Sequence, residues 1–322
     1  MQHLDLLVLE QALDWAAQDR SLWLCTVIST FGSAPRSPGA MLVVDETGAS
    51  VGSLSGGCVE EEFFASLAGG HFRQAAQVIS YGTSTEERQR LQLPCGGSLE
   101  VLVEFREPSP QWKIHLQVLL DVLRGQRRIL RRVSLSDGSF SLCSEEACTS
   151  NVRHERNHVQ IGIGPALRVL LAGLSPVAQA CGQFAKALGC EVVVCDPREE
   201  VRDLAIDGVE LLPILPSLFI ANGGCHAATA VVALTHDPKI DDLTLMEAVN
   251  TQAFYIGAMG SRRTSEKRAE RLARIGELSA EQIARLHMPI GLDLGSRTPT
   301  EIALAVMADV LRVYRGKDRA AL

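Results

Sequence analysis

Strand-like and helix-like segments alternate along the chain from Leu167 onward. The expected strands are 167–173, 191–197, 229–236 and 253–260, and the expected helices are 176–189, 241–249, 262–275, 280–286 and 299–315. Such an alternation requires a parallel sheet whose crossover connections are right-handed. The sequence therefore predicts a doubly wound α/β sheet, which binds its ligand at the carboxyl ends of the strands.

The first half of the chain has another pattern and predicts a second α/β domain. Apolar residues at helical spacing predict a helix, and β-rich runs between turn residues predict strands. The expected helices are 4–17 and 112–124, and the expected strands are 22–30, 40–46, 49–54, 77–82, 98–105, 129–135 and 139–143. The polar segment 144–158 has no apolar periodicity and is interpreted as a linker. The 322 residues are thus expected to form two domains, 1–160 and 161–322.

Charge and composition exclude several classes of protein. The net charge of −7 and the pI near 5.7 argue against a nucleic-acid partner. No segment is apolar for long enough to span a bilayer, and the N-terminus has no basic leader, so we expect no membrane partner and a cytoplasmic location. Nine cysteines without a CxxC pair suit a reducing compartment. Four of them lie in apolar runs and are expected in the core: Cys25, Cys181, Cys190 and Cys195.

The first strand-to-helix turn of the second domain is AGLSPVA at 172–178. A turn that binds dinucleotides in a Rossmann fold carries three glycines, and only Gly173 is present here. Ser175 places a side chain where pyrophosphate approaches, and Pro176 removes an N–H donor. Asp196, at the end of the next strand, is placed to accept a ribose hydroxyl. An equally open interpretation is that the domain merely has a Rossmann-like fold and that this degenerate turn binds no dinucleotide.

Residues 235–239, THDPK, end the third expected strand at the same edge of the sheet. His236 is therefore a candidate for ligand contact or proton transfer. Asp237 is better explained as a helix N-cap, because a proline follows at the first helical position.

A pair of arginines opens the helix that follows the fourth expected strand. Ser261 can cap this helix, and Arg262 and Arg263 lie in its first turn. Cations are unfavourable at the positive end of a helix dipole, so the pair indicates a phosphate site. The alternative is that both arginines are surface residues paired with Glu266 or Glu270.

Segment 287–303 ends in a clear helix start. Thr298 is the expected cap, Pro299 the first helical residue, and Glu301 the partner in a capping box. The glycine-flanked loop before it carries Asp293. Ligand contact and hydrogen bonding within the loop are both open roles for Asp293.

Three glycine-rich loops of the first half could share one rim of its sheet, and they carry Arg36, Cys58 and Cys95. A thiol in a loop that leads into a helix stays accessible and is favoured as a thiolate. Cys58 and Cys95 are therefore the cysteines expected to function. The alternative is that a Gly-Gly turn tolerates any small residue.

Read together, these segments resemble the XdhC/CoxI family over nearly the whole chain. GSAPRSPGAMLV, GSLSGGCVE and PCGGSLEVLVE resemble its N-terminal domain. VVVCDPR, LTHDPKIDD, FYIGAMGSRRT and HMPIGLDLGSRTPTEIA resemble its Rossmann-like C-terminal domain. The turn AGLSPVA departs from the family's more glycine-rich turn, and segment 212–228 offers no motif.

The resemblance implies a non-catalytic chaperone of molybdenum hydroxylases such as xanthine dehydrogenase. Such a protein binds molybdenum cofactor (molybdopterin) transiently, assists its sulfuration with a cysteine desulfurase, and inserts it into the apo-hydroxylase. By this resemblance Arg36, Cys58 and Cys95 face the metal end, with Cys58 and Cys95 as metal ligands. The other residues assigned to the cofactor are Gly173, Asp196, His236, Ser261, Arg262, Arg263 and Asp293. A homodimer stays open.

Two other functions fit the sequence less well. An NAD(P)-dependent oxidoreductase needs the full glycine fingerprint that this turn lacks. An adaptor that binds only proteins leaves the arginines and thiols of the loops without a role.

Overall fold

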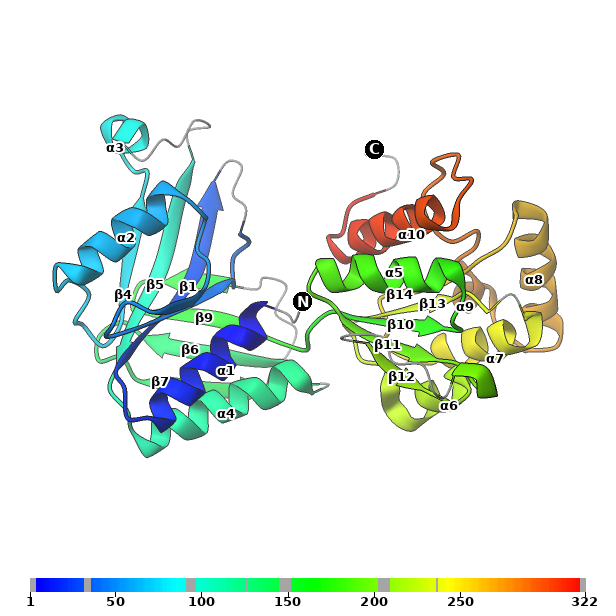
Figure 1. Ribbon diagram of the computed structural model, residues 1–322, viewed down its shortest axis with the longest axis horizontal. Coiled ribbons are helices and arrows are strands. Elements are labelled where there is room, and N and C mark those ends of the chain that lie inside the picture. Colours follow the sequence, from blue (N-terminus) through cyan, green and yellow to red (C-terminus); the bar gives the residue numbers. More distant parts are fainter. Residues whose placement is uncertain are drawn as a thin grey trace. The chain divides into compact units, whose positions relative to one another are not determined.

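The computed structural model describes residues 4–31, 36–90, 97–125, 127–144, 152–201, 209–235 and 237–318. The chain folds into two compact units, Leu4–Pro165 and the residues from Ala166 onward (Figure 1). Both units combine helices with sheets, so the mixed α/β class expected from the sequence is confirmed.

A five-stranded antiparallel sheet forms the centre of the N-terminal unit. Its order is β3-β2-β1-β5-β4, with β1 Leu22–Phe31, β2 Met41–Asp45, β3 Ser50–Gly52, β4 Gln77–Tyr81 and β5 Ser98–Arg106. Helix α2 (Cys58–Ala68) packs on one face, and α1 (Leu4–Ala17) and α4 (Pro110–Arg124) pack on the other. A short helix, α3 (Thr85–Arg90), precedes β5. Strand β1 is apolar without alternation because both of its faces are buried.

A second, four-stranded antiparallel sheet completes this unit. Its order is β7-β6-β9-β8, with β6 Ile129–Ser134, β7 Phe140–Ser144, β8 Val152–Glu155 and β9 His158–Ile163. The interpretation of 144–158 as a linker is therefore wrong over its described part. Strand β8 lies at the edge of this sheet beside β9 and is mostly exposed, so its residues carry no apolar alternation from which a strand could be predicted.

A buried ionic cluster lies where the two sheets meet. Arg131 of β6 donates Nη1 and Nη2 to the two carboxylate oxygens of Glu104 of β5, at 2.7 and 2.8 Å. Arg106 also donates to Glu104. Arg131 Nε donates to His115 Nε2 of α4 at 2.8 Å. Every member is hydrogen-bonded, as a buried charge requires.

A six-stranded parallel sheet forms the centre of the C-terminal unit. Its order is β12-β11-β10-β13-β14-β15, with β10 Arg168–Ala172, β11 Glu191–Cys195, β12 Glu210–Leu212, β13 Thr229–Ala233, β14 Tyr255–Ala258 and β15 Leu286–His287. Along the chain this is strand order 3-2-1-4-5-6, which confirms the doubly wound Rossmann-like sheet. The order reverses between β10 and β13, and ligands of such sheets bind at the carboxyl ends there.

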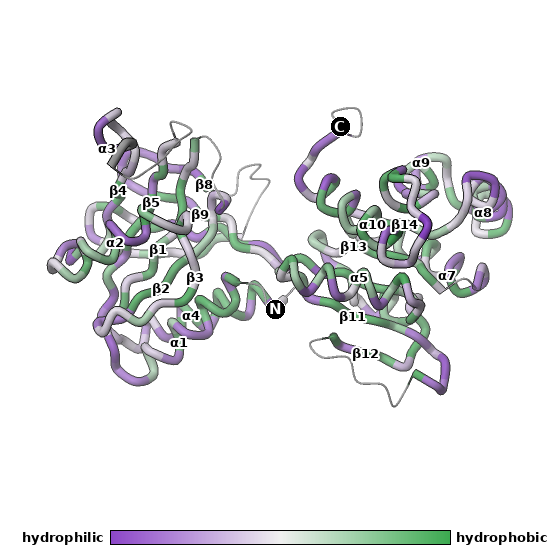
Figure 2. The backbone as a smooth tube through the Cα atoms, turned by 45° about the horizontal axis from the view of Figure 1, so that its top comes forward, coloured by the Kyte–Doolittle hydropathy of each residue, from purple (hydrophilic) through white to green (hydrophobic). Residues whose placement is uncertain are grey.

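Helices cover both faces of this sheet (Figure 1). One face packs against α5 (Pro176–Ala187) and α10 (Pro299–Tyr314), and the other against α7 (Pro238–Ala248) and α8 (Arg262–Arg274). A short helix, α9 (Ala280–Ala284), precedes β15. Figure 2 shows hydrophobic colour along the strands and largely hydrophilic colour on α8. Helix α8 thus presents most of its side chains to solvent.

The sequence did not predict four short elements of this unit. Strands β12 and β15 have three and two residues, too few for a pattern to be visible. Helix α6 (Pro216–Phe219) and a turn of π-helix (Ile220–Gly224) lie in the segment in which no motif was found.

Candidate functional site

The turn after β10 needs a glycine because nothing larger fits. Gly173 has a φ of +91°, and a Cβ atom there would lie 2.5 Å from Thr235 Cγ2. Its amide donates to the Cys195 carbonyl at 2.9 Å. The turn is therefore fixed against the carboxyl ends of both β11 and β13.

Ser175, at the second glycine position, caps α5 with its own side chain. Its Oγ accepts from the Ala178 amide at 3.2 Å, and the residue is 7% exposed. Pro176 follows as the first helical residue and has no N–H. The start of α5 therefore offers an anion fewer free donors than a glycine-rich turn does.

Asp196 lies next to this turn, but its carboxylate is already engaged by the chain. It accepts from the Leu174 amide at 2.7 Å and from the Arg198 amide at 3.0 Å. Arg198 Nε and Nη2 also donate to it, at 2.9 and 2.6 Å. Burial alone would raise the pKa of Asp196, but the hydrogen bonds from Arg198 and Leu174 outweigh burial and lower it.

Asp237 caps α7, which confirms the role favoured for it from the sequence. Its side chain accepts from the Lys239 amide at 2.9 Å, and Pro238 is the first helical residue. His236 lies outside the described residues, so its expected role as a ligand contact stays a prediction.

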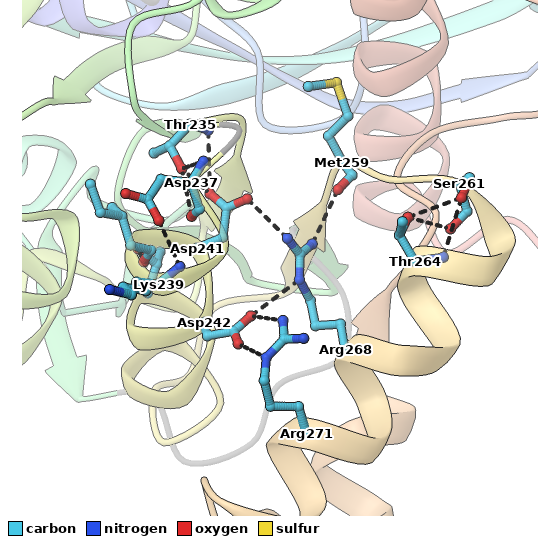
Figure 3. Close-up of polar contacts among 12 residues, drawn as sticks. Thr235, Asp237, Lys239, Asp241, Asp242, Met259, Ser261, Thr264, Arg268 and Arg271 are labelled. Atoms are coloured by element: carbon cyan, nitrogen blue, oxygen red, sulfur yellow. Dashed lines mark hydrogen bonds and ion pairs between the residues drawn. The ribbon is translucent and has the colours of Figure 1, made fainter.

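Helix α7 contains an acidic residue, Asp241, whose role was not predicted from the sequence. Asp241 is 1% exposed, and its Oδ1 accepts from the Thr235 hydroxyl at 2.6 Å (Figure 3). Its Oδ2 accepts from Arg268 Nη2 of α8 at 3.1 Å. Arg268 Nη1 donates to the Met259 carbonyl, just after β14, at 3.1 Å. One buried ion pair thus joins the carboxyl ends of β13 and β14 to helices α7 and α8.

A neighbouring pair extends this connection along the two helices. Asp242 accepts from Arg271 Nη2 at 3.0 Å and forms an ion pair with Arg268 Nε at 3.2 Å (Figure 3). The signal in the sequence was the pair of aspartates facing two arginines three residues apart, which lie on one face of α8. That signal becomes informative only once the two helices are known to be neighbours.

The first turn of α8 presents two cations that the described chain does not neutralise. The cap predicted at Ser261 is present, because its Oγ accepts from the Thr264 amide at 3.2 Å. Arg262 and Arg263 are exposed, and neither forms an ion pair with a described residue. The alternative pairing with glutamates of the same helix is therefore absent from this part of the chain.

Asp293 is exposed in the loop before α10 and makes no hydrogen bond to any residue the structure describes. The capping box after it is confirmed: Thr298 Oγ1 accepts from the Glu301 amide at 3.3 Å, and Glu301 accepts from the Thr298 amide at 3.1 Å. Of the two roles left open for Asp293, hydrogen bonding within the described part of the loop is not observed.

In the N-terminal unit, strand register brings together the strand ends that flank the three glycine-rich loops. Phe31 at the end of β1 pairs with Ser98 at the start of β5, and Tyr81 at the end of β4 pairs with Leu99. Strand β3 ends at the same rim, since Gly52 pairs with Leu42 near the start of β2. The described strand ends that flank these loops therefore lie at one rim.

Arg36 is held inside this rim by the chain itself. Its Nε donates to the Ser53 carbonyl and its Nη2 to Asp5 of α1, both at 3.2 Å. Cys58 is the first residue of α2 and is half-buried. Cys95 lies outside the described residues. The structure therefore brings Arg36 and Cys58 to one rim, where Arg36 already has a carboxylate partner.

The four cysteines expected in the core are buried. Burial raises the pKa of Cys181 and Cys195 to about 12 and that of Cys190 to about 11. These thiols are therefore unreactive in the folded chain. Within the ranges that the structure describes, no group of three or more His, Cys, Asp or Glu side chains is placed to hold a metal ion.

A pocket of about 280 Å³ lies beside α5, between the helix and the strand residues Leu171 and Val194. Its polar lining comes from Gln179, Gln183 and Lys186. None of the residues predicted from the sequence line it, so the carboxyl edge of the sheet stays the candidate site. Among the described residues, every helix is too short or too polar to cross a bilayer.

Comparison with known proteins decides the family. Residues 15–82 match the XdhC and CoxI family, and residues 169–310 match the XdhC Rossmann domain. The chain belongs to the XdhC and CoxI family. The XdhC Rossmann match includes the first turn, the Asp241–Arg268 pair, the start of α8 and Asp293. The XdhC and CoxI match includes Arg36 and Cys58 and ends before Cys95.

Relatives of this family match the chain over almost its whole length. The molybdenum cofactor insertion chaperone PaoD of Escherichia coli is 28% identical over 97% of this chain and 90% of its own. A Bacillus subtilis protein described as a probable subunit of xanthine dehydrogenase is 22% identical over 91% of this chain and 93% of its own. A crystal structure of a protein from Bacillus halodurans, described as a xanthine dehydrogenase, superimposes with a TM-score of 0.74 at 23% identity, covering 100% of this chain and 98% of its own. The last match shows the shared fold.

Proposed function

We propose that this protein is a chaperone that binds molybdenum cofactor and inserts it into an apo-hydroxylase of the xanthine dehydrogenase type. The name and full-length similarity of the E. coli chaperone support this function. Assistance in sulfuration, with a cysteine desulfurase as partner, belongs to the same proposal. A cytoplasmic location and a homodimer stay predictions.

The observation that carries the proposal is the arginine pair at the start of α8, which no described carboxylate neutralises. Molybdenum cofactor ends in a phosphate and carries its metal on two sulfur atoms. Arg262 and Arg263, with the amides of the first turn, are suited to hold that phosphate. Their position next to the carboxyl end of β14 is the edge at which such sheets bind ligands. Asp293 and His236 are proposed as further contacts at this edge.

The thiols of the N-terminal rim are proposed for the metal end. A thiolate is a soft ligand and matches a metal already bound by sulfur. Cys58 is the half-buried first residue of α2, and Cys95 is proposed as the second thiol at this end. Arg36, held by Asp5, is proposed to orient the loop rather than to bind an anion directly.

The rival function, an NAD(P)-dependent oxidoreductase, has less support. Ser175 fills the turn, and Asp196 is bonded within the chain. Either feature weakens dinucleotide binding.

The proposal is tested by replacing both arginines with alanine. The protein and its variants are expressed in cells that make molybdenum cofactor, and molybdenum and pterin are quantified after gel filtration. Arg262→Ala with Arg263→Ala is expected to weaken binding by ~1.5–3 kcal/mol, the scale of hydrogen bonds to charged groups, or roughly 10- to 150-fold.

The matched control is Lys267→Ala with Arg274→Ala, which removes two exposed cations from the same helix but not from its first turn. This control should retain the cofactor. If the Arg262/Arg263 variant retains the cofactor, the assignment of its phosphate to these two arginines is wrong, but the chaperone function is not contradicted. A parent protein that retains no molybdenum or pterin would contradict the chaperone function itself.

A further inference from the structure

The carboxyl ends of β10 and β11 contain the parts of a ribose site in an unusual arrangement. In a Rossmann fold that binds dinucleotides, an acidic residue at the end of the second strand accepts the two ribose hydroxyls. Asp196 stands at that position, one residue after β11. Gly173 also stands where the first glycine of such a turn is required.

Arg198 forms hydrogen bonds with the carboxylate oxygens of Asp196 to which a ribose would bind. Its Nε donates to both oxygens of Asp196, at 2.9 and 3.2 Å, and its Nη2 donates to Oδ2 at 2.6 Å. The Leu174 amide donates to the same Oδ2 at 2.7 Å. Both oxygens of Asp196 are thus bonded within the chain.

Arg198 also bridges the loops that follow β10 and β11. Its Nη2 donates to the Leu174 carbonyl in the first turn at 2.7 Å. The arginine side chain is 56% exposed, whereas that of Asp196 is 3% exposed. Arg198 is therefore the solvent-facing member of the pair, with its carboxylate partner beneath.

A ribose cannot readily displace this arginine. Hydrogen bonds between a guanidinium and a carboxylate join two charges and are about twice as strong as those between neutral groups. The hydroxyls of a ribose are neutral donors. Their binding to Asp196 would also take the carboxylate away from Arg198 and open its bridge to the Leu174 carbonyl.

We propose that Arg198 closes a ribose-binding site in this domain and so excludes dinucleotides such as NAD and FAD. The inference does not depend on the molybdenum cofactor function. It assigns a specificity-determining role to a residue outside the glycine turn. Removal of the Arg198 side chain should therefore create an affinity for ribose-containing dinucleotides that the parent protein lacks.

The test measures binding of ADP-ribose, which carries the ribose and pyrophosphate groups but no redox ring, by calorimetry on the full chain. The parent protein is expected to bind more weakly than about 1 mM. Arg198→Ala is expected to bind at least ~10-fold more tightly, a gain of about 1.4 kcal/mol. ADP-ribose should also raise the melting temperature of this variant and not that of the parent.

Two further variants keep the test decisive. Arg198→Ala combined with Asp196→Asn should lose the gain, because the amide replaces the carboxylate acceptor. Arg198→Lys retains the charge but cannot bond both carboxylate oxygens and the carbonyl, so a smaller gain is expected, and this variant decides if the alanine variant does not fold.

Equal binding by the parent and Arg198→Ala, or a folded variant without any gain, overturns the proposal. Tight binding of NADPH by the parent that is lost in Arg198→Ala also overturns it, because Arg198 would then be a contact for the 2′-phosphate.

Discussion

Each unit buries an arginine against a carboxylate, but the two pairs lie in different places. The side chains of Glu104 and Arg131 are 0% and 1% exposed and join the two sheets of the N-terminal unit. Those of Asp241 and Arg268 are 2% and 9% exposed and lie at the carboxyl ends of β13 and β14. The chemistry is the same in both pairs. Only the second pair lies at the sheet edge where folds of this kind bind their ligands, so burial of an ion pair alone does not identify a site.

The two carboxylates also respond differently to burial. Burial would raise the pKa of Glu104, but Arg131 and Arg106 outweigh it and lower that pKa to about 2. The pKa of Asp241 is raised, because burial outweighs the hydrogen bond from Thr235 and the charge of Arg268. Glu104 is therefore the more fully compensated charge.

The largest expected effect comes from removing the arginine of each pair. Arg131→Met leaves Glu104 with a buried charge that Arg106 alone must balance, and it should lower the free energy of unfolding by ~3–5 kcal/mol. Arg268→Met should cost ~1–3 kcal/mol, because Asp241 keeps its bonds from Thr235 and can be protonated more readily.

Both variants are measured by urea unfolding of the full chain. The three tryptophans, Trp15, Trp23 and Trp112, lie in the N-terminal unit, so their fluorescence reports that unit, while circular dichroism reports both. Arg131→Met should shift the fluorescence transition and Arg268→Met only the remaining dichroism transition. A larger loss of unfolding free energy for Arg268→Met than for Arg131→Met would contradict the conclusion that Glu104 depends more strongly on its arginine than Asp241 does.

The same two pairs show what the sequence could and could not predict. Continuous apolar runs predicted the buried strands, and local cap signals at Ser261 and Thr298 were confirmed, because both depend on neighbours in the sequence. Neither Arg131 nor Asp241 had a role that could be recognised in the sequence. Each is explained only by a partner 27 residues away in the sequence.

Exposed and very short elements were missed for a different reason. An edge strand such as β8 is polar, and β15 has two residues, so neither has a period that could be recognised. At the candidate site, the arginine pair of α8 could be predicted from the sequence, whereas the hydrogen bonds that occupy Asp196 could not. The first is visible as a local charge anomaly, whereas the second requires knowledge of where Arg198 points.

A smaller, pH-dependent effect should distinguish the two units. Burial and the charge of Arg131 lower the pKa of His115 to about 3. Between pH ~6.5 and ~3, His115 is therefore protonated in the unfolded chain but neutral in the folded chain. Stability of the N-terminal unit should fall as the pH drops through this window, by up to about 1.4 kcal/mol per pH unit for this group.

The fluorescence transition in urea, followed from pH 7 to pH 5, measures this slope. His115→Gln keeps an acceptor for Arg131 but does not titrate, so its slope should be flatter. His226 of the C-terminal unit, whose pKa burial lowers to about 4, provides the matched control. His226→Gln should leave the tryptophan slope unchanged, and an equal flattening by both variants would show that the fluorescence does not separate the units.

The smallest effect on stability is expected at Cys58, where the rim and the core of the N-terminal unit can be compared with one substitution. Cys58→Ser exchanges a half-buried first helical residue for one of nearly the same size, so the free energy of unfolding should change by less than about 0.5 kcal/mol. Cys25→Ser places a hydroxyl in the core and should cost about 1 kcal/mol. Molybdenum retention should show the opposite order, falling in Cys58→Ser and in Cys95→Ser but not in Cys25→Ser, because only an accessible thiolate can bind the metal end. Full retention and hydroxylase activation by the combined Cys58→Ser and Cys95→Ser variant would exclude cysteine ligation while leaving the arginine site of α8 untouched.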